Sequence, residues 1–312
     1  MSSWDYDLII VGGGPAGLTA GLYAGRARLK TLLLEKLIYG GQVMTTDLVE
    51  NYPGFPDGVT GFELSDRMRQ QAERFGLETR FAEVLKLEPG APHQLVLEDG
   101  RLTAGAVIIA TGARYKKLEV PGEDRLIGKG VSFCATCDGA LYRDQEIAMV
   151  GGGDNALTET IFLNRFARKI HLIHRRNAFR AAKYLQEQVF NLEKVQIHWD
   201  TEVDEFLGQD HLEAVRLRNV RTQERTILPL AGAFITIGMV PNTAWLQDLL
   251  PLDELGFIFT DVDMGTSIPG LFAAGDVRSK SVRQISTAVG DGAVAALAAE
   301  RYLEELHHKE AP

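Results

Sequence analysis

The sequence predicts an α/β protein made of two Rossmann-like dinucleotide-binding domains with three-layer ββα architecture, the second inserted into the first. Two observations predict this fold. A strand, a glycine-rich loop, a helix and a second strand follow one another twice, starting at residues 8–11 and again at residues 147–150. Two further strand patterns, at residues 107–112 and 270–276, precede and follow the second copy. The chain of 312 residues is long enough for about two domains.

The first copy runs from the apolar strand into a glycine loop, then into a helix pattern that reaches about Arg28. A second apolar strand ends at Glu35, where a carboxylate can accept hydrogen bonds from adenosine ribose hydroxyls. Glycines in such a loop let the backbone approach a pyrophosphate, and the free N–H groups of the following helix favour negative charge. One such motif is a weak signal, whereas two in the correct context are a strong one. The predicted binding residues of this loop are Gly12, Gly14, Pro15, Ala16 and Gly17.

The second copy has the same spacing but a different end. Its helix pattern reaches about Arg168, and its second strand ends at His174 where the first copy has Glu35. Arginines follow that position, and guanidinium groups bind a 2′-phosphate that a carboxylate would repel. We therefore expect FAD at the first loop and NADPH at the second. An exposed basic turn and a ligand-free glycine turn are the alternatives. The predicted NADPH residues are Gly151, Gly153, Asp154, Asn155, Ala156, His174, Arg175, Arg176 and Arg180.

The only two cysteines, Cys134 and Cys137, form a CxxC motif just ahead of the second loop. A structural zinc site needs about four nitrogen or sulfur ligands, and the chain has no second CxxC and no His-x3–5-His. A disulfide that closes so short a loop removes little chain entropy, so a purely stabilising role is disfavoured. The motif is therefore interpreted as a redox dithiol, and no metal site is predicted.

The order of the segments predicts discontinuous domains. Residues 1–117 and 244–312 would form the FAD-binding domain, and residues 118–243 the NADPH-binding domain that carries the CxxC. The chain would cross between them near residues 116–121 and 239–243, both of which contain proline. Asp276 follows a predicted strand of the first domain, where it can bond a ligand or act as an ordinary helix N-cap.

Composition narrows the functional classes. The formal net charge of −9 disfavours a nucleic-acid partner, which requires a basic face. No apolar run approaches the length of a membrane span, and the first residues lack the pattern of a signal peptide. Two cysteines without an export signal favour a reducing compartment, so we expect a cytoplasmic protein.

These residues together resemble the bacterial-type low-molecular-weight thioredoxin reductases. The sequence Cys-Ala-Thr-Cys-Asp-Gly ahead of a second dinucleotide loop is the most specific part of the resemblance. The matching segments are residues 12–17, 40–42, 50–56, 110–113, 134–139, 151–156, 174–180, 273–277 and 283–284. For the FAD site the resemblance implies, in addition, Gly41, Gln42, Asn51, Thr111, Gly112, Asp276, Arg283 and Gln284.

The resemblance implies a homodimer whose NADPH domain rotates on its two linkers. Electrons would pass from NADPH to FAD, then to the Cys134–Cys137 disulfide, and then to thioredoxin or a thioredoxin-like protein. Cys137 would face the flavin and attack the partner, and Cys134 would resolve the mixed disulfide. Asp138 would act as acid and base, with a helix N-cap as the alternative reading.

Some positions depart from the family. Ala140 and Leu141 stand where an aromatic pair is usual, which removes apolar contact area for thioredoxin. Thr158 and Asn177 replace acidic residues of the second dinucleotide site. Two alternatives therefore stay open: a related flavoprotein with another electron donor, such as ferredoxin, or with a non-standard thioredoxin-like partner, and a flavin-binding redox sensor without turnover.

Overall fold

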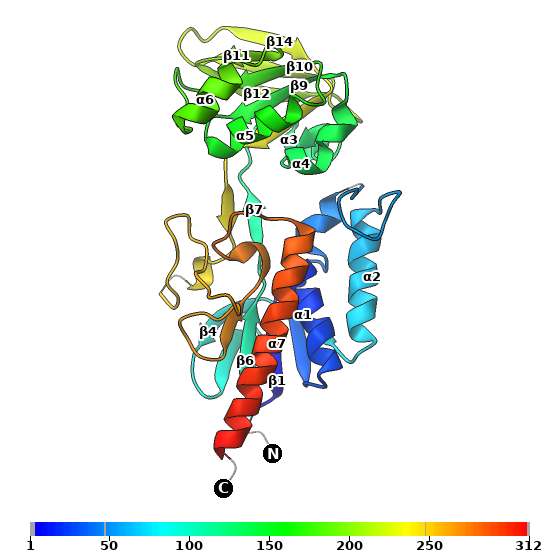
Figure 1. Ribbon diagram of the computed structural model, residues 1–312, viewed down its shortest axis with the longest axis vertical. Helices are drawn as coiled ribbons and strands as arrows, with labels where there is room; N and C mark the ends of the chain where they lie inside the picture. The colour runs from blue at the N-terminus through cyan, green and yellow to red at the C-terminus, as the bar shows by residue number, and fades with distance from the viewer. Residues whose placement is uncertain (1–3, 47, 247, 311–312) are drawn as a thin grey trace. The chain divides into compact units, whose positions relative to one another are not determined.

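The computed structural model describes residues 4–46, 48–246 and 248–310, and its contacts divide the chain into two compact units. Unit 1 comprises Met1–Arg114 and Val240–Pro312, and unit 2 comprises Tyr115–Met239 (Figure 1). These divisions lie a few residues before the boundaries that the sequence placed at residues 117 and 243. No helix in the described ranges is both long enough and apolar enough to cross a membrane.

Unit 1 is built on a seven-stranded sheet. Its parallel part has the order β3-β2-β1-β6, with β17 pairing in parallel with β6, and β5 and β4 extend it as antiparallel strands. Leu8, Ile9 and Ile10 are fully buried, as expected for a parallel strand covered on both faces. The strands are β1 (Tyr6–Val11), β2 (Thr31–Glu35), β3 (Glu78–Phe81), β4 (Val84–Glu88), β5 (His93–Leu97), β6 (Gly100–Ile109) and β17 (Leu271–Ala273).

One face of this sheet is covered by α1, α2 and α7, which lie together in Figure 1. Small side chains let α1 and α7 approach closely: Ala20 and Ala24 share a core cluster with Ala295 and Ala299. The opposite face packs against the segment around Leu246 and Ile258. The helical elements are α1 (Pro15–Arg26), η1 (Gly41–Thr45), α2 (Gly61–Glu73), η3 (Ala244–Leu246), η4 (Gly275–Val277) and α7 (Ile285–Glu310).

Unit 2 has three layers. A parallel sheet of order β11-β10-β9-β15-β8 lies between helices and a three-stranded antiparallel sheet. The strands of the two sheets are β8 (Val131–Ser132), β9 (Glu146–Gly151), β10 (Lys169–Ile173), β11 (Val195–His198), β12 (Thr201–Leu207), β13 (Ala214–Asn219), β14 (Arg225–Pro229) and β15 (Gly232–Thr236). The helical elements are α3 (Glu123–Leu126), α4 (Ala135–Asp138), η2 (Gly139–Tyr142), α5 (Asp154–Leu163) and α6 (Lys183–Phe190). The fold with two Rossmann-like units, the second inserted into the first, is confirmed.

Helix α5 ends earlier than the sequence pattern predicted. The pattern reached Arg168, but the helix stops at Leu163. Phe166 and Ala167 both donate backbone hydrogen bonds to the Leu163 carbonyl, and Arg168 donates to Gln145, which starts the approach to β10. The apolar periodicity therefore continues into a turn that packs on the same core.

The chain leaves and re-enters unit 1 through two short paired strands, β7 (Ala113–Tyr115) and β16 (Met239–Pro241). The backbone of Lys116 adds a hydrogen bond of 3.0 Å to the Gly238 carbonyl.

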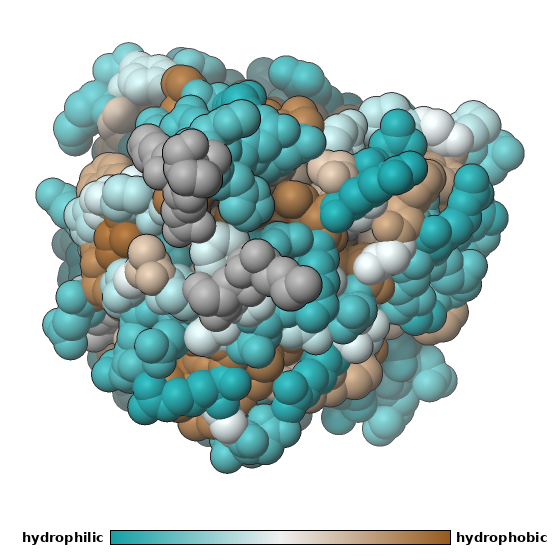
Figure 2. All heavy atoms as spheres, turned by 90° about the horizontal axis from the view of Figure 1, so that it is seen from below, coloured by the Kyte–Doolittle hydropathy of each residue, from teal (hydrophilic) through white to brown (hydrophobic). Residues whose placement is uncertain are grey.

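In the view of Figure 2, hydrophilic residues cover most of the visible face, with apolar residues between them in small groups.

A pair of histidines in unit 2, one buried and one partly buried, gives the fold a predicted acid sensitivity. His171 Nδ1 lies 3.0 Å from His198 Nε2, and burial, followed by the charges of His171 and Lys169, lowers the pKa of His198 from 6.5 to about 4. The unfolded chain thus binds a proton below pH 6.5 that the folded chain refuses until about pH 4, so folding stability falls as the pH drops through this window. The loss is on the order of 2–3 kcal/mol.

We expect the His198→Gln variant to lose less unfolding free energy than the unmodified protein between pH 7 and pH 4.5. Urea unfolding at several pH values, followed by tryptophan fluorescence, measures this. The exposed His211 supplies the control, because His211→Gln leaves the histidine pair intact. Equal pH slopes in all three proteins would contradict the assignment.

Candidate active site

The two cysteines form a disulfide on the surface of unit 2, with an S–S distance of 2.06 Å. They flank the start of the one-turn helix α4, and both side chains are partly exposed. Cys134 is itself the N-cap residue, because its Sγ accepts a hydrogen bond of 3.2 Å from the Cys137 backbone N–H. Cys134 Sγ also lies 3.4 Å from the Thr136 hydroxyl. The disulfide is thus presented by a short, hydrogen-bonded turn.

Asp138 is held beside the disulfide by Ser132, a residue that sequence reasoning did not select. The Ser132 hydroxyl donates to Asp138 Oδ2 at 2.5 Å and accepts from the Cys134 backbone N–H at 3.1 Å. Asp138 ends α4 and is also the N-cap residue of η2, but its side chain makes no capping hydrogen bond there. Burial, and then the nearby charge of Asp138, raises the pKa of the Tyr142 hydroxyl to about 12.

The first glycine loop connects β1 to α1 in unit 1. A Cβ at Gly17 would overlap the Gly12 carbonyl oxygen, so the helix approaches the strand as closely as the sequence predicted. A Cβ at Gly14 would meet no described atom within 4 Å, so this position faces open space. Pro15 occupies the first turn of α1, where its missing N–H costs no hydrogen bond, and Ala16 is buried.

Glu35 closes this loop from the end of β2. Its Oε2 accepts from the Gly13 N–H at 2.7 Å, and its Oε1 accepts from the Leu37 N–H at 2.8 Å. A carboxylate has about four acceptor positions, so acceptor capacity remains for ribose hydroxyls. Glu35 therefore orders the loop and keeps acceptor capacity for a further donor.

Other predicted residues of unit 1 pair with one another. Asn51 donates to the Gln284 side chain at 3.1 Å, which joins the segment after η1 to the start of α7. Thr111 donates to the Asn242 carbonyl at 3.0 Å, and the Gly112 carbonyl accepts from the Asn242 N–H. Gln42 donates from its side chain to the Ala113 carbonyl, and Gly41 adopts a positive φ of 57° in the turn before it.

Asp276 has an unsatisfied buried atom. Among the described residues no hydrogen-bond partner reaches its Oδ1, and Lys280 Nζ lies 3.6 Å away. Burial raises the pKa of Asp276, and the charges of Lys280 and Arg283 oppose that shift. The Arg283 guanidinium lies over the Phe257 ring, 3.9 Å from its centroid. A buried carboxyl oxygen that lacks a hydrogen bond, together with the open space at Gly14, fits a polar dinucleotide such as FAD.

The second glycine loop connects β9 to α5 in unit 2. A Cβ at Gly153 would meet no described atom within 4 Å, whereas one at Gly151 would lie 2.5 Å from the Thr236 carbonyl oxygen. Asp154 begins α5, and its Oδ1 accepts from the Ala182 N–H at 2.7 Å. Ala156 is buried against Gly151, and Asn155 follows Asp154 in the exposed first turn.

The His174 side chain packs against the second glycine loop. Its ring fills the space beside Gly152, packs near Phe179 and Trp199, and its Nε2 lies 3.0 Å from the Ala178 carbonyl. Burial is the main cause that lowers the pKa of His174, so the ring is neutral at pH 7. A neutral buried ring positions the loop and brings no charge to a phosphate.

The three arginines after His174 remain available to a ligand. Arg175, Arg176 and Arg180 are exposed, and within the described ranges none of their guanidinium groups pairs with a carboxylate. The backbone N–H of Arg180 donates to the Gly152 carbonyl at 2.9 Å, which brings this segment to the glycine loop. The donor set fits a phosphorylated ribose, as in NADPH. No group of three or more acidic, histidine or cysteine side chains that could hold a metal occurs in the described residues.

Comparison with known proteins gives extensive matches. Residues 6–292 match the pyridine nucleotide-disulphide oxidoreductase family. A thioredoxin reductase of Listeria innocua is 46% identical over 303 residues, which cover 96% of this chain and 95% of that protein. The solved thioredoxin reductase of Streptococcus pyogenes is 46% identical, with a TM-score of 0.93 and coverage of 96% and 98%. That of Lactococcus lactis, in an FR conformation, is 43% identical, with a TM-score of 0.66 and coverage of 96% and 100%.

Gly14 faces open space and Gly17 lies against the Gly12 carbonyl, so these two glycines of the first loop give a matched pair of variants. Gly17→Ala forces the Gly12 carbonyl to move, so we expect its holoprotein to unfold several degrees earlier, for a loss of about 1–3 kcal/mol. Gly14→Ala keeps an extended backbone that alanine adopts freely, so we expect normal folding but roughly tenfold weaker FAD binding. Thermal unfolding and flavin-release fluorescence separate the two effects. A Gly14→Ala protein that retains FAD as well as the unmodified protein would remove this loop from the FAD site.

Removing the basic residues should change coenzyme preference. We expect Arg175→Gln combined with Arg176→Gln to raise the KM for NADPH about a hundredfold while changing that for NADH less than threefold, because only NADPH carries the 2′-phosphate. Anaerobic flavin bleaching at increasing coenzyme concentration measures both. Lys183→Gln, in the same unit, is the control for a general loss of positive charge. Parallel losses with both coenzymes would show that the arginines do not read the 2′-phosphate.

Proposed function

The chain belongs to the pyridine nucleotide-disulphide oxidoreductase family, among its thioredoxin reductases, and from this premise we propose which residues carry the reaction. The protein is an FAD-dependent oxidoreductase that uses NADPH and transfers electrons through Cys134 and Cys137 to a protein disulfide, with thioredoxin as the partner. The observation that carries this function is the partly exposed Cys134–Cys137 disulfide on α4, in the same unit as an arginine-marked glycine loop.

We assign the FAD site to unit 1 and the NADPH site to unit 2. When bound, FAD would supply the redox chemistry that links NADPH to reduction of the Cys134–Cys137 disulfide. The backbone of the first loop, with Glu35 behind it, would receive the pyrophosphate and ribose of FAD. The Oδ1 of Asp276, which has an ion-pair contact with Lys280 but no hydrogen bond among the described residues, would bond the flavin side of the molecule. In unit 2 the second loop and Arg175, Arg176 and Arg180 would hold NADPH.

Thiol–disulfide exchange then transfers the electrons from the reduced cysteines of this chain to the partner protein. The Cys137 thiolate attacks one sulfur of the partner disulfide, forms a mixed disulfide, and releases the other partner sulfur as a thiolate that takes up a proton. Cys134 then attacks the Cys137 sulfur, which releases the second partner thiol and restores the Cys134–Cys137 disulfide. Two electrons and two protons have moved from this dithiol to the partner.

Asp138 is placed to move those protons. The Ser132 hydroxyl orients its carboxylate and also bonds the Cys134 backbone, so the acid–base group and the disulfide are fixed to one residue. We propose that Asp138 accepts the proton of the attacking thiol and donates one to the leaving thiolate.

The two connections between the units support a hinge. The chain passes between them only through β7 and β16 and the residues beside these short strands. We propose that unit 2 turns on this pair, because electron input and partner reduction require the disulfide in two different surroundings. If another donor, such as ferredoxin, reduced the flavin, the three exposed arginines would have no role. If the protein were a redox sensor without turnover, Asp138 would have no role.

We also propose a homodimer that works in the cytosol. Leu37, Phe62 and Phe81 are exposed apolar side chains of unit 1, the kind of surface that subunit interfaces bury. The absence of any cysteine beyond the redox pair fits a reducing compartment. Sedimentation equilibrium of the holoprotein should give twice the chain mass, and a single chain mass would contradict the dimer.

The function is tested by NADPH consumption with purified thioredoxins from the source organism. We expect Cys137→Ser and Cys134→Ser to abolish turnover while flavin reduction by NADPH continues. Asp138→Asn should lower kcat on the order of a hundredfold with little change in KM, because proton transfer is lost and docking is not. Asp124→Asn, an exposed change in the same unit, is the control. NADPH consumption without reduction of any thioredoxin would refute the proposal.

A further inference from the structure

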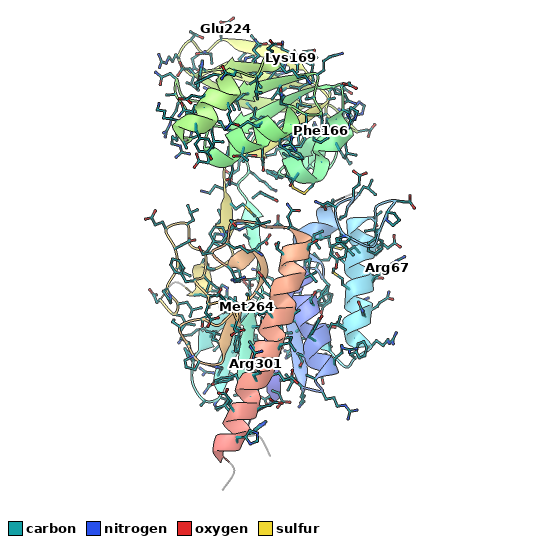
Figure 3. All side chains as sticks on the ribbon, viewed as in Figure 1. Arg67, Phe166, Lys169, Glu224, Met264 and Arg301 are labelled. Atoms are coloured by element: carbon teal, nitrogen blue, oxygen red, sulfur yellow. A yellow bond between two sulfur atoms is a disulfide. The ribbon has the colours of Figure 1, made fainter. Side chains whose placement is uncertain are left out.

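Beside the redox disulfide, unit 2 carries a surface cluster that the reaction does not use. It consists of Arg143, Phe162, Arg165 and Phe166, and is called here the arginine–phenylalanine patch. Figure 3 labels Phe166 just beyond the end of α5, on the same side of unit 2 as α4. Phe162 lies in the last turn of α5, Phe166 in the turn after it, and Arg143 directly follows η2.

The side chains of the patch contact one another. The ring centroids of Phe162 and Phe166 lie 5.3 Å apart. The Arg165 guanidinium carbon lies over the Phe162 ring at 5.5 Å from its centroid, and that of Arg143 lies over the Phe166 ring at 5.6 Å. A guanidinium that contacts a ring in this way keeps its N–H donors for another acceptor.

The patch adjoins the disulfide through Gly139, the second residue after Cys137. A Cβ at Gly139 would lie 2.8 Å from Leu163 Cδ2 and 3.3 Å from Phe162 Cε1. The backbone at Gly139, directly after α4, therefore packs on the side chains of Phe162 and Leu163 at the end of α5. Any protein that brings its own disulfide to Cys137 also meets the surface of α5 beside it.

The guanidinium groups of Arg143 and Arg165 can bind a partner protein. Both arginine side chains are exposed, and in the part of the chain that the structure describes neither guanidinium pairs with a carboxylate. Arg143 and Arg165 place two positive charges side by side at this surface, so carboxylates of a partner are attracted here. Leu141, half exposed after Gly139, extends the apolar area, and Phe162 and Phe166 are partly exposed.

We propose that the arginine–phenylalanine patch is the docking surface for the protein disulfide partner, and that it selects partners with an apolar side chain bordered by carboxylates next to their disulfide. This inference rests on the proposed function. Aromatic rings and arginines supply most of the binding energy at protein interfaces, and here the two occur together. The residues directly after Gly139 are the small Ala140 and the aliphatic Leu141, so the aromatic contact area comes from α5 and the turn after it.

The experiment uses single charge reversals in the holoprotein. Arg143→Glu and Arg165→Glu should each lower kcat/KM for thioredoxin about tenfold at low ionic strength, through KM, with kcat within about twofold. Their kcat/KM should also depend less on salt than that of the unmodified protein. The control is Arg221→Glu, which changes the charge equally in the β13–β14 turn, where Figure 3 labels Glu224 far from Phe166.

A rescue identifies the partner side. Thioredoxin variants in which exposed carboxylates near the disulfide are changed one at a time to lysine are assayed against Arg165→Glu and Arg143→Glu. Recovery of kcat/KM by at least one such pair supports direct docking, since a merely structural effect of the arginine change would not be repaired from the other protein.

The outcomes separate the two proposals. Anaerobic flavin reduction by NADPH should be the same in all variants, which shows that electron supply is intact. If the unmodified protein turns over thioredoxin but both arginine variants match Arg221→Glu, the docking surface is overturned and the proposed function stands. If no thioredoxin is reduced by the unmodified protein, the proposed function is overturned and the docking surface with it.

Discussion

The close approach of backbone to backbone at the two glycine loops is the constraint on which both units depend. Helix α1 can follow β1 so tightly only because Gly17 has no side chain to meet the Gly12 carbonyl, and Ala156 plays the equivalent part against Gly151. This approach points free helix N–H groups at the space beside Gly14 and Gly153, where an anion is favoured. The sheets, the covering helices and the supporting Glu35 and His174 fix the loops in that geometry.

Helix α5 runs from the second glycine loop to the segment that carries the disulfide. Its first residue, Asp154, directly follows the second glycine loop. Its last turns pack against Gly139 and so against the helix that carries Cys137. Phe162, at the same end, contributes to the surface that a partner protein meets. One short helix thus joins the proposed coenzyme site, the disulfide and the proposed docking patch, and a shift of α5 would alter all three.

The sequence was sufficient for features that depend on local spacing. The glycine loops, the carboxylate at Glu35 and the arginines after His174 follow from strand and helix lengths that are nearly constant in such folds. Features that depend on distant pairing were not predictable. Ser132 lies only six residues before Asp138, but it is fixed in β8, which pairs with β15 about a hundred residues later, and the spacing alone does not indicate a hydrogen bond between the two side chains. The early end of α5 and the burial of His174 likewise follow from tertiary packing, which overrides periodicity.

The central claim is that Cys134 and Cys137 cycle between disulfide and dithiol by way of NADPH and a thioredoxin. The most direct measurement is anaerobic thiol trapping of the holoprotein, with mass spectrometry of the alkylated peptide that spans Cys134 and Cys137. After one equivalent of NADPH per active site beyond that needed to reduce the flavin, both cysteines should become alkylated, and oxidised thioredoxin should return them to the disulfide. A disulfide that persists after the flavin has been reduced would contradict the account.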